Sequence, residues 1–115
     1  VARLHNVVNT LQQCGHHVYC FQFEKRGDTE PTPDEALRLA IDELQSCDAI
    51  FVIKSSERRS EGQLIEVGAA LAQGKRIFVA QHRSAVGTTY LPTLADASFV
   101  WDDEESLLAG ICAVL

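Results

Sequence analysis

One carboxylate is distinguished by its surroundings, because Glu66 lies inside an apolar stretch of small residues at positions 60–75. That stretch follows a very hydrophobic run at positions 49–53, and its spacing is helical. Glu66 either belongs to a solvated helix face, shared with Gln63 and Ala70, or is a reagent positioned beside a ligand. A positioned carboxylate can act as a nucleophile or as a proton carrier. The spacing leaves both readings open.

Polar residues near the start of this helix could bind the rest of a ligand. Ser60 precedes the first helical turn and Gly62 lies in it, so unpaired backbone N–H groups there could hold a phosphate or a sugar hydroxyl. Ser55 follows the run at 49–53 and is expected in the same region. Ser60 has a second reading as an ordinary helix N-cap, with Gln63 in the capping-box position. Substrate binding is predicted for Ser55, Ser60 and Gly62.

Other catalytic patterns are missing from the sequence. His16 and His17 are adjacent, so in a strand they would point to opposite faces, and no nearby cysteine or carboxylate completes a tetrahedral metal site. No GxGxxG, GxxxxGK[ST] or GxSxG motif is present. This disfavours dinucleotide oxidoreductases, P-loop NTPases and α/β-hydrolases. We therefore expect neither a metal nor a cofactor.

The composition is that of an ordinary globular protein. The chain has 115 residues, of which 46% are hydrophobic, and this suits one domain spanning residues 1–115. A formal net charge of -6 argues against a nucleic-acid polymer or an anionic membrane as partner, because both select basic surfaces. No apolar run reaches the roughly 20 residues of a membrane span. Cys14, Cys20, Cys47 and Cys112 lack CxxC spacing, which favours free thiols and a cytoplasmic location.

The elements that must position these residues alternate along the chain. Apolar periodicity and capping signals predict helices at about residues 4–14, 33–46, 60–74 and 103–114. Apolar and β-branched runs predict strands at about residues 17–23, 49–53, 76–80 and 98–101, with a long loop at 81–97. Thr32 is expected to cap the second helix and Asp102, with Glu105, the last one. This order predicts an α/β fold with a flavodoxin-like or Rossmann-like parallel sheet and helices on both faces.

In open parallel sheets, ligands bind beyond the carboxyl ends of the strands. Four polar segments are expected at that edge, namely residues 23–25, 54–56, 60–62 and 81–83. Asp48 precedes its strand and is expected to be structural, while Gly68 is expected to let its helix approach the sheet closely. A fold of this order normally starts with a central strand. The first strand is missing from the chain, so we expect one before Val1 or from a partner.

The pattern of these residues resembles the nucleoside 2-deoxyribosyltransferase family, including its nucleoside-monophosphate N-glycosidase branch. The resemblance is carried by residues 47–52, Ser60-x-Gly62-x-x-x-Glu66-x-Gly68, Gly74-Lys75-Arg76 and Gly15-His16-His17-Val18-Tyr19. It implies that Glu66 is the nucleophile, which attacks the anomeric carbon of a deoxyribosyl group and forms a covalent glycosyl-enzyme. It also implies that Ser60 contacts the sugar or 5′-phosphate. The partner implied is a nucleoside or nucleotide, and the assembly a homodimer or larger.

One position departs from the family pattern. Ala40 stands where the family carries an Asp that handles the proton on the nucleobase. The leading interpretation is cleavage or transfer of the N-glycosidic bond of a (deoxy)nucleoside or its 5′-monophosphate. A nucleotide-binding module without activity, on the same fold, is a second interpretation and is favoured by Ala40. A TIR-like NAD-cleaving or signalling domain is a third, although no Trp-Cys pair lies near Glu66.

Overall fold

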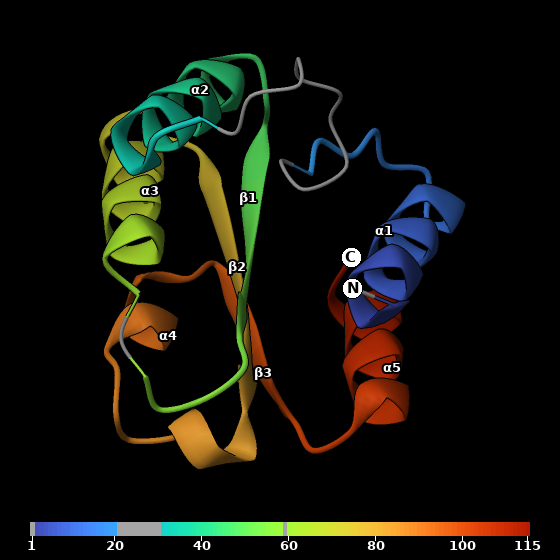
Figure 1. Ribbon diagram of the computed structural model, residues 1–115. Coiled ribbons are helices and arrows are strands. Elements are labelled where there is room, and N and C mark those ends of the chain that lie inside the picture. Colours follow the sequence, from blue (N-terminus) through green and yellow to red (C-terminus); the bar gives the residue numbers. More distant parts are fainter. Residues whose placement is uncertain (1, 21–30, 59) are drawn as a thin grey trace.

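A three-stranded parallel sheet forms the centre of the protein, whose computed structural model describes residues 2–20, 31–58 and 60–115 (Figure 1). Strands β1 (Ala49–Lys54), β2 (Arg76–His82) and β3 (Ala97–Trp101) lie in the order β1-β2-β3. Both neighbouring pairs run parallel. The last three strands of a flavodoxin-like sheet have the same consecutive order, so the predicted parallel α/β sheet is confirmed.

Helices cover both faces of this sheet, as predicted. Figure 1 shows α2 (Pro33–Gln45), α3 (Glu61–Ala72) and α4 (Leu91–Leu94) on one side, with α1 (Ala2–Gln13) and α5 (Glu104–Val114) on the other. Each side has its own core. The first core comprises Leu44, Val52, Val67, Ala70, Ile77, Val79 and Leu91. The second comprises Val7, Leu11, Ala80, Trp101, Leu107 and Ile111.

The middle strand β2 contributes to both cores because successive side chains point to opposite faces. Val79 packs on the α3 side and Ala80 on the α5 side, and both are fully buried. At the carboxyl end of the sheet, the register places Lys54 of β1 beside Gln81 of β2. Because of this alternation, the polar side chains of Lys54 and Gln81 lie on the same face of the sheet at that edge.

Side-chain caps begin α2 and α3 where the sequence predicted. The Thr32 hydroxyl accepts a hydrogen bond from the Glu35 N–H at 3.4 Å, and the Ser60 hydroxyl accepts one from the Gln63 N–H at 3.2 Å. Gly74 follows α3 with a φ of 72°, the left-handed conformation that ends many helices. Local backbone rules therefore position the start of α3 correctly.

The cap of α5 was predicted one residue too early. Asp103, not Asp102, accepts a hydrogen bond from the Ser106 N–H at 2.8 Å. The Ser106 hydroxyl accepts one in return from the Asp103 N–H at 3.1 Å. This reciprocal pair satisfies two N–H groups at the helix start. Asp102 instead pairs with Arg83, and Glu105 is not part of the cap.

Three other expectations need correction. Residues 17–20 form neither helix nor strand, and the rest of the strand expected at 17–23 lies outside the described residues. The expected loop at 81–97 contains the end of β2, a 3-10 turn η2 (Arg83–Ala85) and α4. Gly68 is exposed on α3, where an added Cβ would meet nothing within 4 Å, so it does not serve close packing against the sheet.

Within the described residues, no helix has both the length and the apolar character to span a membrane.

Candidate functional site

A pocket of about 370 Å³ opens where β1 ends and α3 begins. Its wall combines the last residues of the strand, the connecting loop and the first turn of the helix. The lining residues are Ile53, Lys54, Ser55, Ser56, Arg58, Ser60 and Gln63. The structure thus brings together Ser55 and Ser60, two of the predicted binding residues, at the carboxyl edge of the sheet. Ligands of open parallel sheets bind at this edge.

Two cationic side chains give this pocket a positive character. Lys54 is only 5% exposed, and its Nζ donates a hydrogen bond to the backbone oxygen of Arg58. Arg58 is exposed and lines the same pocket. The amino end of α3 adds the partial positive charge of a helix terminus. Although the protein carries a net charge of -6, the pocket favours an anionic group.

Ser60 is both a helix cap and part of the pocket wall. Its oxygen accepts from the Gln63 N–H, and a hydroxyl in that role keeps its own proton available as a donor. The Gln63 side chain does not complete a capping box; its Nε2 donates to the Ile53 backbone oxygen at 2.9 Å. This bond joins the first turn of α3 to the end of β1 and holds the two pocket walls together.

Glu66 lies on α3 just beyond the pocket and is not among its lining residues. Three residues after Gln63, it is displaced by about 4.5 Å along the helix and roughly 60° around it. Its side chain is half-buried, and this burial raises the pKa of Glu66 above its ordinary value. Among the described residues, its carboxylate has no hydrogen-bond or ion-pair partner. A desolvated, unpaired carboxylate beside a pocket is characteristic of functional sites.

Gly62 is half-buried in the first turn of α3 and does not line the pocket. A Cβ added there would meet the Ser60 Oγ at 3.9 Å, which is an ordinary van der Waals contact. Packing within the protein therefore does not require glycine at this position. Its predicted role toward a ligand stays a prediction.

No protein-family model matches the chain, and no curated protein sequence matches it significantly. Solved structures do match, among them the CMP N-glycosidase BcmB of Clostridium botulinum. That likeness has a TM-score of 0.74 at 22% identity and covers 99% of this chain and 89% of that chain. The chain has a nucleoside 2-deoxyribosyltransferase-like fold.

The described lining of the pocket contains no carboxylic acid. Ala40 is a half-buried residue of α2, and the lining residues that the structure describes include no Asp or Glu. No group of three or more His, Cys, Asp or Glu side chains within the described ranges could hold a metal ion. The described part of the pocket offers cations, hydroxyls and an amide, but no proton donor of the carboxylic type.

The sequence indicated that Gln81 lies at the carboxyl edge of the sheet, but it did not indicate that the side chain is buried. It is 8% exposed, and its Oε1 atom has no hydrogen-bond partner among the described residues. It lies beside Lys54 in the sheet register, on the face covered by α3. Gln81 was expected in the loop after the strand predicted at 76–80, and nothing in the sequence indicated its burial, because that burial depends on strand register.

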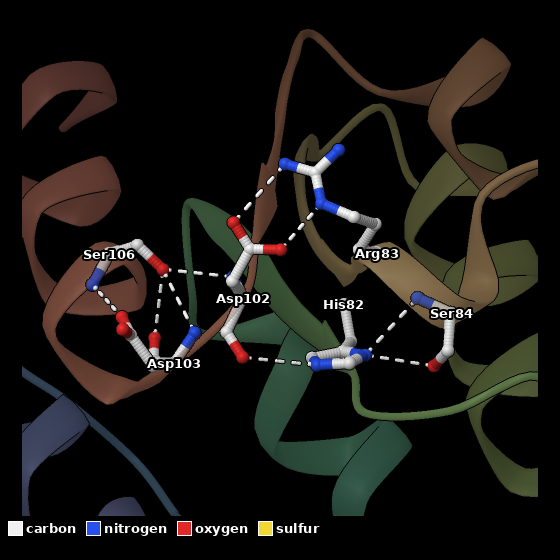
Figure 2. Close-up of polar contacts among 6 residues, drawn as sticks. All are labelled: His82, Arg83, Ser84, Asp102, Asp103 and Ser106. Carbon is white, nitrogen blue, oxygen red and sulfur yellow. Dashed lines mark hydrogen bonds and ion pairs between the residues drawn. The ribbon is translucent and has the colours of Figure 1, made fainter.

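A polar network connects the ends of β2 and β3 at the same edge of the sheet (Figure 2). His82 Nδ1 accepts from the Ser84 N–H at 3.1 Å, so its Nε2 carries the proton and donates to the Asp102 backbone oxygen at 3.1 Å. Arg83 binds the Asp102 carboxylate through Nε at 2.5 Å and through Nη2 at 3.2 Å. This pairing holds the pKa of Asp102 below its ordinary value. All of these contacts are internal, which indicates a structural role.

Proposed function

We propose that this protein cleaves or transfers the N-glycosidic bond of a (deoxy)nucleoside or its 5′-monophosphate, with Glu66 as the nucleophile. The observation that carries the proposal is the half-buried, unpaired Glu66 carboxylate next to a cationic pocket. The fold shared with a CMP N-glycosidase supports it. The proposal also takes residues 1–115 as one domain of a cytoplasmic protein.

The two ends of a nucleotide suit the two parts of the site. The 5′-phosphate would bind between Lys54, Arg58 and the Ser60 hydroxyl, where charge-assisted hydrogen bonds and the helix terminus all favour an anion. The anomeric carbon lies several bonds away from the phosphate, so it would sit farther along α3. In this arrangement Glu66, three residues after the lining residue Gln63, would face the anomeric carbon.

The chemistry would follow the two steps of retaining glycosidases. Ionised Glu66 attacks the anomeric carbon, the C–N bond breaks, and its electron pair leaves with the base, which takes up a proton. Water, or the hydroxyl or amine of an acceptor, then attacks the glycosyl ester, gives up a proton and restores the carboxylate. Partial burial strips water from Glu66, which favours its reaction with a developing oxocarbenium centre.

The proton for the leaving base needs a donor other than residue 40, which is alanine. A missing general acid typically costs a factor of about 10² to 10⁴ in rate. We propose a homodimer in which the partner subunit supplies this group or completes the pocket. A second candidate function, nucleotide binding without turnover, is favoured by the same absence of a carboxylic acid in the described lining.

A base-release screen tests the proposal. Purified protein is incubated with ribo- and deoxynucleosides and with their 5′-monophosphates, and free base is measured by chromatography. Glu66→Gln removes the nucleophile, while Glu61→Gln is the matched control, because Glu61 is an exposed residue of the same helix. We expect base release by the wild type and by Glu61→Gln, and none by Glu66→Gln. Equal silence of all three, with thermal stabilisation by a nucleotide, would replace the proposal with the binding module.

A further inference from the structure

Helices α1 and α5 pack side by side on the sheet face opposite the pocket (Figure 1). Val7 and Leu11 of α1 are buried against α5 in the second core. Cys14 continues the helical turn beyond α1, because its N–H bonds the Thr10 and Leu11 oxygens at 3.1 and 3.2 Å. Residues three apart on a helix share a face, so Cys14 lies on the face that carries Leu11.

Cys112 occupies the corresponding place on α5. It follows Leu108 by four residues and precedes Leu115 by three, and both leucines pack against the second core. Cys112 therefore lies on the side of α5 that carries these two leucines. Cys112 lies within interaction range of Cys14: desolvation, followed by the side-chain interaction with Cys112, raises the pKa of the Cys14 thiol. Both residues are exposed thiols.

We propose that Cys14 and Cys112 are a dithiol site that closes to a reversible intramolecular disulfide on exposure to a peroxide or a low-molecular-weight disulfide. With oxidised glutathione, one thiolate attacks the glutathione disulfide and releases one glutathione thiolate. The second cysteine thiolate then attacks the mixed disulfide and releases the other. The two protein thiols lose two protons and two electrons, and one glutathione disulfide becomes two thiols.

This bond would join the two ends of the described chain. A cross-link between such distant residues restricts the unfolded chain strongly and so stabilises the folded state. The pocket and Glu66 lie on the other face of the sheet, so the inference is independent of the proposed function. We expect the melting temperature to rise by at least about 5 °C on oxidation, and to return to its starting value on reduction.

The test uses the full chain treated with oxidised glutathione at mildly alkaline pH. Thiol alkylation and peptide mass spectrometry then identify the linked peptides, and melting curves are recorded before and after dithiothreitol. Cys14→Ser and Cys112→Ser should each abolish the link and the shift. Cys47→Ser is the control and should keep both, because Cys47 is half-buried and its thiol donates to the Glu43 backbone oxygen at 3.4 Å.

Three outcomes would overturn the inference. They are a stable glutathione adduct at Cys14 or Cys112 without the link, disulfide-joined dimers in place of the intramolecular bond, and a melting temperature that does not rise on oxidation. If a serine variant melts earlier than the wild type under reducing conditions, Cys112→Ala replaces it, since alanine fits a helix well.

Discussion

Glu66→Gln isolates the energetic effect of the half-buried carboxylate, because it keeps the size of the side chain and removes the charge. Burial raises the pKa of Glu66 in the folded protein above its ordinary value of 4.5. The folded state therefore binds this proton more tightly than the unfolded state does. The contribution to the free energy of unfolding is fully present below the unfolded pKa and is lost as pH rises through the folded pKa. At neutral pH the wild type should be less stable than Glu66→Gln.

The magnitude follows from the partial exposure of the side chain. Water still reaches a half-buried carboxylate and screens its charge, so ionising Glu66 costs less than ionising a fully buried carboxylate. We expect Glu66→Gln to be more stable by about 0.5–1 kcal/mol near neutral pH. For a chain of this size, this corresponds to an increase of roughly 2–4 °C in the melting temperature.

Thermal and urea denaturation of the wild type, Glu66→Gln and Glu61→Gln between about pH 4 and 8 would measure this difference. The gain of Glu66→Gln should vanish toward the acid end, where the wild-type carboxylate is protonated. Glu61 lies in the first turn of α3, where a negative charge is favourable, so Glu61→Gln should lose about 0.3–1 kcal/mol at neutral pH. If Glu66→Gln were less stable than the wild type at neutral pH, Glu66 would have a stabilising partner and the interpretation of an unpaired reagent would be refuted.

Two further predictions address packing and binding. Gly68→Ala should raise the free energy of unfolding by about 0.5–1 kcal/mol, because the site is open and mid-helix. Gly110→Ala should lower it by about 1–3 kcal/mol, because the added Cβ would lie 2.2 Å from the Phe99 ring. Equal urea midpoints for the two variants would contradict this packing. Lys54→Met should weaken binding of a nucleoside 5′-monophosphate at least about tenfold in calorimetry, and binding of the parent nucleoside much less. An equal loss of affinity for both ligands would contradict phosphate binding in this pocket.

The parts of the fold that depend on local rules could be predicted from the sequence. The apolar run at 49–53 marked β1, and the hydroxyls of Thr32 and Ser60 marked the starts of α2 and α3. Each of these signals acts between residues close in sequence, either by periodicity or by a hydrogen bond within one turn. The predicted parallel order followed from their alternation and is confirmed.

The parts that depend on distant residues could not be predicted in the same way. Asp102 was expected to cap α5, but Arg83 binds it from across the sheet edge, and Asp103 takes the cap. Helix α4 has only four residues, too few for a periodic signal, and buries Leu91 in the first core.

The same distinction between local signals and distant contacts applies to the candidate site. The sequence indicated Ser55, Ser60 and Glu66 from their places near strand and helix ends, and the first two line one pocket. The burial of Lys54 and Gln81 depends on how β1 and β2 align, and the desolvation of Glu66 depends on how α3 packs. These properties become visible only in three dimensions.

The role of Glu66 as nucleophile can be tested most directly by trapping the glycosyl-enzyme. A 2′-fluorinated analogue of the substrate found in the screen would slow the second step, because fluorine destabilises the oxocarbenium-like transition state. Fragmentation mass spectrometry of the peptide spanning residues 60–75 then distinguishes Glu61 from Glu66. We predict a sugar adduct on Glu66 in the wild type and in Glu61→Gln, and none in Glu66→Gln. Release of base by the wild type with no adduct on Glu66, or an adduct that persists in Glu66→Gln, would contradict this role.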